Sequence, residues 1–480
     1  MNKLKDLEPK SVFKYFEELS QVPRGSGNMD AVSSYCEEFA KAHSLKYYRD
    51  SANNVIIYKD ASEGYENSDP VILQAHLDMV CQKDEGVEID FEKEAIDIYV
   101  DGDFIKARGT TLGADNGISA ACLLAILESD EIEHPPLEVV FTTDEEIGMI
   151  GAMALDFDKL KGKKMINADS EEPGIVTVSC AGGSDFVSKI PVEYQISAGD
   201  GVSVTVRGLK GGHSGVEIDK GRINSNVLLG RILNHLSENA EFEIADINGG
   251  DKANAIPLLA QANLVVQNGK SFVIKANEYA NIIKEEMSAR EENLEIEIKL
   301  AGEVKTKVFD KNARDSIVYV LTCVPNGVIT MSAEIEELVE TSLNLGILKT
   351  QDDGVILHHA LRSNKKSALA FLEDRLKTFY KIGKCSVETF GHYPPWEYND
   401  NSLLQTLYCD IYKETTGKDA LVKAIHAGLE CGVFASNIEG FDCISIGPEM
   451  YDIHTTSERV SISSVKETYE IILKLLKRSK

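Results

Sequence analysis

The chain has 480 residues, of which 43% are hydrophobic and 27% charged, which is typical of a globular protein with two or three domains. Its 50 Lys and Arg against 78 Asp and Glu give a formal net charge of −28, which would repel a phosphate backbone and excludes nucleic acid as the expected partner. The uninterrupted apolar runs fall well short of a membrane span, so no membrane association is expected.

The nine cysteines are scattered and form no Cys-x-x-Cys pair, and the charged first residues lack the apolar core of a secretory signal. Thiols in such a chain are expected to be reduced, and we therefore expect a cytoplasmic protein.

The first portion of the chain alternates helical and strand patterns. Residues 11–20 and 28–43 have helical spacing of apolar positions, and Asn53–Tyr58 resembles a strand. Further apolar runs predict strands at Val71–Leu73, Leu137–Phe141 and Met165–Ile166, with a buried helix at Gly117–Glu128 between the first two. This alternation predicts an α/β fold with a central, mostly parallel sheet between helices.

The pattern changes near Val187. Strands are predicted at Val202–Val206, Ala260–Val266, Leu294–Leu300 and Val318–Cys323, and helices at Asn224–Leu236, Asn277–Glu292 and Ser367–Phe379. These elements suggest a second α/β domain.

The last portion returns to the style of the first. It has a predicted helix at Ser402–Thr415, a strand at Phe441–Ile446 and an amphipathic helix at Ser463–Lys477. The simplest architecture is a discontinuous catalytic domain built from residues 1–186 and 386–480, with an inserted α/β domain at residues 187–385.

Polar side chains follow the predicted strands of the first domain at four separate places. Sites in open α/β sheets form beyond the carboxyl ends of the strands, so these side chains are expected to meet at one edge. They are His76 and Asp78 in "VILQAHLDMV", Glu145 and Glu146 in "FTTDEEIG", Asp169 in "INADSEEPG" and His454 in "MYDIHTTSERV".

Asp115 joins this set from "GTTLGADNGI", just before the helix at Gly117–Glu128, where free N–H groups also suit a carboxylate that merely caps the helix. Imidazoles and carboxylates without cysteine suit zinc, cobalt or manganese. One ion needs about four ligands and the set offers more, so two cations sharing a bridging carboxylate are expected.

The neighbours of these residues also have alternative interpretations. Asp78 lies two residues from His76 in an extended chain and can accept its second ring N–H, which would fix the tautomer, although His-x-Asp alone is a weak signal. If the backbone is extended at Glu145 and Glu146, one can ligate while the other faces the substrate. An isolated Asp-Glu-Glu could equally be the solvated start of a helix.

In this order, "HLDMVCQK", "GTTLGADNGI", "TTDEEIGMIGA" and "INADSEEPG" resemble the co-catalytic di-zinc metallopeptidases that include carboxypeptidase G, peptidase T and the carnosinases. Within that family they are most similar to the aminoacyl-histidine dipeptidases, over essentially the whole chain. One departure is Cys81, where related sequences usually carry proline; we interpret it as a packing substitution.

The resemblance implies a role for each residue of the first domain. His76 and Asp169 would hold one metal, Glu146 and His454 the other, and Asp115 would bridge them. Asp78 would orient His76, and Glu145 would be the general base. A cis peptide bond at Asp115–Asn116 is also common in the family.

The inserted domain of this family is a lid that often mediates dimerisation. The family's lid histidine, which polarises the scissile carbonyl, corresponds to His213 in "GGHSG", although a turn histidine between glycines is the alternative. Asn254 and Arg362 resemble residues that hold a substrate carboxylate, for which a guanidinium is well shaped. Glu430, in "HAGLECGVF", lies in a segment that lines the substrate pocket in relatives.

The resemblance implies a metallo-dipeptidase that hydrolyses unblocked dipeptides, Xaa-His among them. We expect it to be a cytoplasmic homodimer. It would use two divalent ions, with zinc as the first choice and cobalt or manganese as alternatives. The same metal centre would serve an N-acyl amino acid amidohydrolase or a tripeptidase, because a fold alone does not separate them. A metal-loaded binding or scaffolding protein would need the five ligands but not Glu145 or His213.

Overall fold

The computed structural model describes residues 3–381 and 383–480. The chain forms two compact units, each with its own core. The first contains Met1–Cys180, Tyr398–Ala424 and Leu429–Lys480, and the second contains Ala181–Glu397 and Ile425–Gly428. The sequence places the changes of domain at 186/187 and 385/386, whereas the units change at 180/181 and 397/398, and the short segment 425–428 belongs to the second unit.

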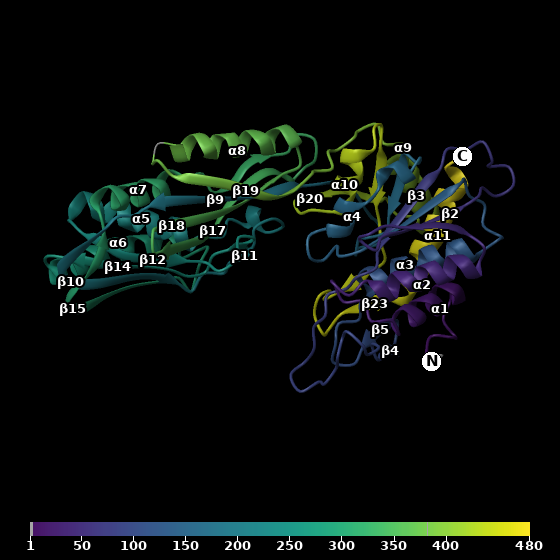
Figure 1. The fold of residues 1–480 in the computed structure, drawn as a ribbon, viewed down its shortest axis with the longest axis horizontal. Coiled ribbons are helices and arrows are strands. Elements are labelled where there is room, and N and C mark those ends of the chain that lie inside the picture. Colours follow the sequence, from purple (N-terminus) through teal and green to yellow (C-terminus); the bar gives the residue numbers. More distant parts are fainter. Residues whose placement is uncertain (1–2, 382) are drawn as a thin grey trace. The chain divides into compact units, whose positions relative to one another are not determined.

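The first unit is built on an eight-stranded sheet (Figure 1). Its order is β1 (Lys46–Arg49), β2 (Val55–Lys59), β6 (Leu137–Thr142), β3 (Val71–His76), β7 (Lys164–Asn167), β21 (Asp442–Ser445), β8 (Ile175–Cys180) and β20 (Leu421–Ile425). The central strands β6, β3, β7 and β21 run parallel, as the sequence predicts. Their carboxyl ends therefore share one edge of the sheet, where a site is expected.

Every residue of β3 and of β6 is buried, so both faces of the sheet are covered. Helix α3 packs on β3 and α9 on β21. The helices of this unit are α1 (Lys10–Leu19), α2 (Asp30–Ala42), α3 (Ala114–Glu128), α4 (Ile150–Ala154), α9 (Leu403–Thr416), α10 (Glu430–Asn437) and α11 (Ile462–Arg478), with a 3-10 turn at Phe157–Lys159.

A small antiparallel sheet completes the first unit and contributes its loops to the site described below. Its order is β22 (Met450–Tyr451), β23 (Arg459–Ser461), β5 (Phe104–Ala107) and β4 (Ile98–Asp101).

The second unit is a nine-stranded sheet in which the strand pairs described are antiparallel. Its order is β15 (Glu295–Phe309), β10 (Tyr194–Arg207), β14 (Ala260–Val266), β12 (Glu243–Gly249), β17 (Val339–Gln351), β18 (Gly354–Ser363), β9 (Gly182–Pro191) and β19 (Ser386–Tyr393), and β16 (Gly327–Met331) pairs with β17. A separate two-stranded ribbon joins β11 (Gly212–His213) to β13 (Ala255–Ile256).

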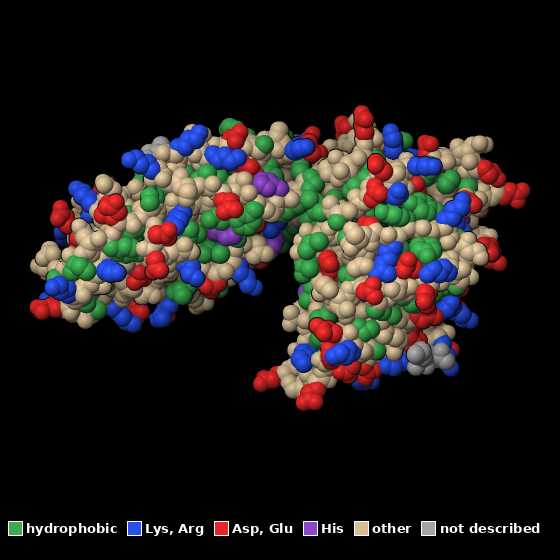
Figure 2. Space-filling view, viewed as in Figure 1, with side chains coloured by type: hydrophobic (Ala, Val, Ile, Leu, Met, Phe, Trp, Pro, Cys, Tyr) green, Lys and Arg blue, Asp and Glu red, His purple; other side chains and the backbone are tan. Residues whose placement is uncertain are grey.

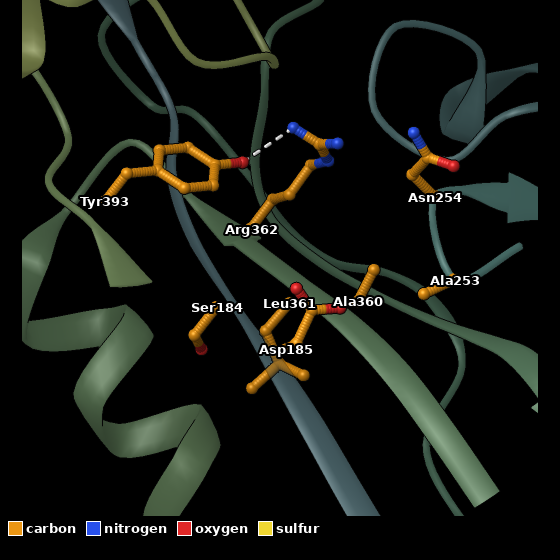
Figure 3. Close-up of a pocket in the computed structure, with 8 residues that line it drawn as sticks. All are labelled: Ser184, Asp185, Ala253, Asn254, Ala360, Leu361, Arg362 and Tyr393. Carbon is orange, nitrogen blue, oxygen red and sulfur yellow. Dashed lines mark hydrogen bonds between the residues drawn. The ribbon is translucent and has the colours of Figure 1, made fainter. Parts of the chain in front are cut away.

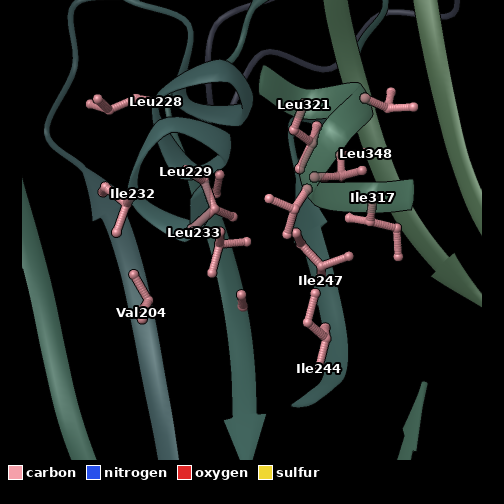
Figure 4. Close-up of a cluster of buried hydrophobic side chains, with 14 of the residues drawn as sticks. Val204, Leu228, Leu229, Ile232, Leu233, Ile244, Ile247, Ile317, Leu321 and Leu348 are labelled. Atoms are coloured by element: carbon pink, nitrogen blue, oxygen red, sulfur yellow. The ribbon is translucent and has the colours of Figure 1, made fainter. Parts of the chain in front are cut away.

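Four helices cover one face of this sheet: α5 (Ser225–Asn239), α6 (Gly269–Met287), α7 (Lys311–Cys323) and α8 (Lys366–Lys381), and a 3-10 turn lies at Ile218–Lys220 (Figure 1). Their apolar faces pack on the strands (Figure 4). The labelled side chains of this core are Val204, Leu228, Leu229, Ile232, Leu233, Ile244, Ile247, Ile317, Leu321 and Leu348.

One prediction of secondary structure is wrong. The sequence predicts a strand at Val318–Cys323, but this segment is the last part of helix α7. The buried residues Ala313, Ile317 and Leu321 recur every four positions, and this helical spacing outweighs the strand-favouring residues of the run "VYV".

Acidic and basic side chains are interspersed on the face of the molecule shown in Figure 2. Among the residues that the structure describes, no helix is long and apolar enough to span a membrane.

Candidate functional site

The parallel strands of the first unit deliver several of the predicted residues to one edge of the sheet. His76 is the last residue of β3, Asp169 lies two residues after β7, and Glu145 and Glu146 follow β6. Glu145 and Glu146 are in a tight turn rather than an extended segment, because the N–H groups of Gly148 and Met149 donate to the carbonyl oxygen of Glu145. Strand alternation therefore does not set the directions of these two side chains.

Asp115 lies between the two histidines. Its Oδ1 is 3.2 Å from Nε2 of His76, and its Oδ2 is 3.1 Å from Nε2 of His454. Although burial opposes ionisation, the hydrogen bonds with His454 and His76 hold the pKa of the Asp115 carboxyl well below its usual range. A carboxylate with one oxygen toward each imidazole has the geometry of a bridging group, and the peptide bond from Asp115 to Asn116 is cis, as predicted.

Asp169 and Glu146 complete the group, one beside each histidine. Oδ1 of Asp169 is 3.3 Å from Nε2 of His76, and Oε1 of Glu146 is 2.9 Å from Nε2 of His454. The five side chains predicted to bind metal thus converge, in the same two pairs around Asp115 that the family resemblance implies. The hydrogen bonds with Asp115 and Glu146 raise the pKa of His454 to about 10.

The donors at this centre fit divalent cations. Ligand atoms of His76, Asp115 and Glu146 all lie within 4.8 Å of one another. Oε1 of Glu146 is buried, and among the described residues the His454 ring is the group within ion-pair distance of it. A buried carboxylate oxygen beside a single imidazole can accept a further contact, and a cation would supply it.

Asp78 contacts both His76 and the loop of Glu145 and Glu146. Nδ1 of His76 is 3.1 Å from the Asp78 carbonyl oxygen and 3.4 Å from its carboxylate Oδ1. The same carboxylate accepts hydrogen bonds from the N–H groups of Glu145 (3.0 Å) and Glu146 (3.2 Å) and from the Ser26 hydroxyl (2.7 Å). Asp78 therefore joins the loop after β3 to the loop after β6.

Glu145 lies among other carboxyl groups. Burial raises the pKa of Glu145 well above its usual range, His76 opposes this, and Asp169 and Glu430 add to it. A carboxylate in such surroundings is a suitable proton acceptor near neutral pH. Cations bound beside it would counter this effect by their own charge.

Glu430 is fully buried at the start of α10. Its Oε2 accepts hydrogen bonds from the Gln74 amide (2.5 Å) and the Thr142 hydroxyl (2.7 Å), whereas its Oε1 is buried without a partner among the described residues. Burial raises the pKa of Glu430 to about 8.

Sequence reasoning missed two buried residues that hold the loops of the site. Glu458 accepts four backbone hydrogen bonds, from Leu112 (2.7 Å), Gly113 (3.0 Å), Ala114 (2.8 Å) and Asp115 (3.3 Å). Glu458 thereby fixes the turn that carries Asp115, the residue proposed to bridge the two metals. The only sequence signal was its place four residues after His454.

Arg24 holds the same turn from another side. Its guanidinium donates to the carbonyl oxygens of Leu77 (2.9 Å), Asp78 (3.4 Å) and Gly113. A Cβ at Gly113, where φ is 71°, or at Gly117 would collide with this guanidinium, so glycine is required at both positions. Burial lowers the pKa of Arg24, and Glu458 and Asp78 oppose the shift.

Glu171 is a third residue that sequence reasoning missed, although it lies two residues after Asp169 in "INADSEEPG". Burial, together with the charges of Asp115 and Asp169, raises its pKa to about 7.

A second group of predicted residues gathers within the second unit. His213 pairs with Ala255 in the ribbon of β11 and β13, and the N–H of Ser214 donates to the carbonyl oxygen of Asn254 (2.9 Å). Nδ1 of His213 accepts hydrogen bonds from the N–H groups of Gly215 (3.2 Å) and Val216 (3.3 Å). The neutral ring therefore carries its proton on Nε2, and burial and the charge of Arg362 lower the pKa of His213.

Arg362 and Asn254 line a pocket of about 280 Å³ in this unit (Figure 3). Only 9% of Arg362 is exposed, and among the described residues its guanidinium forms no ion pair; Nη1 donates to the Tyr393 hydroxyl (2.8 Å), and Nε is buried without a partner. A buried cation without a counter-ion is costly, so the pocket suits an anionic group. In Figure 3 the guanidinium lies between the Tyr393 ring and the Asn254 amide.

His426, beside this group, is fully engaged. Its Nε2 lies 2.7 Å from the Ser342 hydroxyl, and its Nδ1 lies 3.1 Å from Oδ1 of Asn364. Burial lowers the pKa of His426 to about 3, so this ring is neutral and structural.

The chain is similar to known proteins over nearly its whole length. The chain is 38% identical over 481 aligned residues to the cytosol non-specific dipeptidase of Escherichia coli (strain K12), covering 99% of each chain. The crystal structure of aminoacylhistidine dipeptidase from Vibrio alginolyticus is similar with a TM-score of 0.92 and 35% identity, covering 99% of this chain and 98% of that one.

A more distant structure has the same fold. The aminopeptidase PepT of Bacillus cereus gives a TM-score of 0.57 at 15% identity, over 98% of this chain and 99% of that one. The family model described as peptidase family M20/M25/M40 matches residues 72–478. The chain belongs to peptidase family M20/M25/M40 and is a peptide hydrolase.

Proposed function

We propose that this peptidase is a metal-dependent dipeptidase that hydrolyses unblocked dipeptides, including Xaa-His. The observation that carries this proposal is the convergence of His76, Asp115, Glu146, Asp169 and His454 beside Glu145. Two relatives that are 38% and 35% identical over nearly the whole chain are named as dipeptidases, which supports the substrate class.

The five side chains would hold two divalent cations, with His76 and Asp169 on one, Glu146 and His454 on the other, and Asp115 between them. Zinc is the first choice for this nitrogen and oxygen donor set, with cobalt or manganese as alternatives. When bound, the cations would polarise the peptide carbonyl and make a water molecule more acidic.

The protein's own residues would then move one proton. The Glu145 carboxylate accepts the proton of the attacking water and returns it to the nitrogen of the departing amine. The Asp78 carboxylate holds the backbone of Glu145 in place by accepting the hydrogen bond of the Glu145 N–H. His213 would donate its Nε2–H to the carbonyl oxygen as negative charge develops there, because its Nδ1 is already occupied as an acceptor.

Recognition of both ends would restrict substrates to short peptides. Arg362 and Asn254 would bind the free carboxylate, since the guanidinium is buried without a counter-ion among the described residues. Glu430 would line the side that receives the unblocked amino group, using Oε1, which has no partner in the described part of the chain.

We also infer a homodimer in which the second unit acts as a lid and dimerisation domain, as the family resemblance implies. A cytoplasmic location is supported by nine free cysteines and by the name of the Escherichia coli relative. Light scattering on the purified protein and metal analysis would test the dimer and the identity of the ions.

Replacing Glu145 with Gln tests the mechanism. Turnover of Ala-His should fall by about 10²–10⁴-fold, because the proton acceptor is lost, while the metal content stays near that of the wild type. The exposed Glu131→Gln serves as the matched control and should change neither quantity. Unchanged turnover in Glu145→Gln would remove Glu145 from the mechanism.

A substrate panel tests the specificity. Ala-His and Gly-Gly should be cleaved in the presence of added zinc, cobalt or manganese, and Nα-acetyl amino acids and tripeptides should be poor substrates. A preference for blocked amino termini would instead indicate an N-acyl amino acid amidohydrolase, and a preference for tripeptides would indicate a tripeptidase.

A further inference from the structure

The pocket beside Arg362 also contains a negative pole. Strand β18 pairs with β9 so that Arg362 lies opposite Gly183 and Ala360 lies opposite Asp185. Residues opposite each other in an antiparallel pair point to the same face of the sheet, so the guanidinium and the Asp185 carboxylate share one face. Two residues along a strand span about 7 Å, so the pair Arg362 and Gly183 lies about 7 Å along the strands from the pair Ala360 and Asp185.

Small residues keep the space between the two poles open. Ala360 forms the floor beside Asp185, and Ala253 lines the wall next to Asn254 (Figure 3). Gly183 is required because a Cβ there would collide with the Tyr393 hydroxyl, which bonds Arg362. The volume of about 280 Å³ lies at the lower end of the roughly 300–1,000 Å³ of ligand pockets and suits a single residue.

One oxygen of Asp185, Oδ2, forms no hydrogen bond among the described residues. Its Oδ1 is 2.7 Å from Nε2 of His358, and the side chain is 33% exposed. Its Oδ2 lies beside Gly391, where φ is 62° and a Cβ would come within 2.9 Å of that oxygen. Phe390, opposite Asp185 on β19 and 44% exposed, lies with its ring centroid 5.7 Å from that of His358.

We propose that this pocket selects a basic residue at the carboxyl terminus of the peptide, with its α-carboxylate on Arg362 and its side-chain cation on Oδ2 of Asp185. The inference rests on the proposed dipeptidase function and adds a preference at the second substrate position. The flexible four-carbon stem of lysine can span the two poles, and the pocket complements the opposite charges at its ends.

The test compares Ala-Lys with Ala-norleucine, which has a similar length and no charge. The wild type should show a kcat/KM ratio of about fivefold in favour of Ala-Lys, and Asp185→Asn should bring this ratio to about one. A merely structural Asp185 would lower both rates and leave the ratio unchanged. Asp353→Asn, an exposed aspartate of the same unit paired with Lys189, is the matched control and should keep the wild-type ratio.

Charge reversal gives a second readout. Asp185→Lys should prefer Ala-Glu to Ala-Gln, whereas the wild type should not. Equal ratios in wild type and Asp185→Asn, with no reversal in Asp185→Lys, would overturn the proposal.

A binding measurement separates this proposal from the proposed function. Calorimetric titration of the full chain with L-lysine and with L-norleucine needs no turnover. Tighter binding of lysine that Asp185→Asn abolishes would support the pocket even if no dipeptide were cleaved. Equal affinities would overturn it even in an active dipeptidase.

Discussion

At the scale of single residues, the site depends on side chains that touch backbone rather than on the proposed ligands alone. Glu458 is only 3% exposed and accepts the N–H groups of four consecutive residues, ending with Asp115. Without the Glu458 carboxylate these N–H groups would lose their acceptor, and each buried N–H without an acceptor costs about 1–3 kcal/mol.

Replacing Glu458 with Ala should lower the free energy of unfolding by about 3 kcal/mol or more and weaken binding of zinc, because the Asp115 turn loses four acceptor contacts. Urea denaturation measures the first effect and calorimetric zinc titration the second. Glu470→Ala, an exposed substitution on α11, should change neither. A Glu458→Ala protein with wild-type zinc affinity would show that Glu458 does not position Asp115.

The proposed ligands could be collected from the sequence because each follows an apolar strand, and parallel strands end at one edge. Glu458 and Arg24 could not, because their partners are backbone N–H and carbonyl groups, which every residue carries. Asp78 was noticed for its spacing from His76, but its bonds to the N–H groups of Glu145 and Glu146 depend on a turn that no spacing encodes.

At the scale of elements, the contact between β18 and α8 contains a titratable pair. Nε2 of His359 lies 2.6 Å from the hydroxyl of Tyr380 on α8, whose ring stacks on Phe186 of β9. Nδ1 of His359 is buried without a hydrogen-bond partner among the described residues. Burial, with a smaller contribution from His358, lowers the pKa of His359 to about 3.

Acidification should therefore destabilise this contact. In the unfolded chain His359 titrates near about 6.5, so between that pH and about 3 the unfolded state binds the extra proton and the free energy of unfolding falls as pH falls. From pH 6.5 to 5 the wild type should lose about 2 kcal/mol more than His359→Gln. Denaturation curves at the two pH values measure this difference.

His426, whose pKa burial also lowers to about 3, titrates in both proteins and cancels in the comparison. Equal losses in wild type and His359→Gln would contradict a neutral His359 in the folded protein.

The elements also show where sequence periodicity is sufficient. Strand β14 was predicted with its observed bounds, Ala260–Val266, because its alternation is clear. The strand predicted at Val318–Cys323 is wrong because these six residues are only the end of α7. The helix begins after its N-cap, Asp310, and its apolar spacing extends over three turns. The antiparallel order of the second sheet pairs strands far apart in sequence, such as β9 with β18, and local patterns do not encode that pairing.

At the scale of the whole molecule, the two units differ in what stabilises them. The second unit has a continuous apolar core beneath α5 to α8. The first unit contains, in addition, the acidic centre around Asp115, to which β3, β6, β7 and the loop of His454 all contribute. Because all five proposed ligands belong to the first unit, binding of cations should stabilise that unit specifically.

Scanning calorimetry with and without a chelator should separate the two units. Removing divalent ions should lower the transition of the first unit, because a ligand at about 100 times its Kd adds about 2.7 kcal/mol to the folded state. The transition of the second unit should stay in place. His454→Ala should reduce the chelator effect, since His454 contacts both Asp115 and Glu146 and would hold one of the two cations.

Leu233→Ala, in the core beneath α5, identifies the other transition, because loss of a buried leucine costs about 2–5 kcal/mol in the unit that contains it. In this variant the second unit should unfold at a lower temperature and the chelator effect should remain. If the chelator moves the transition that Leu233→Ala moves, or has no effect on the wild type, then the carboxylates and imidazoles around Asp115 do not bind the stabilising ions.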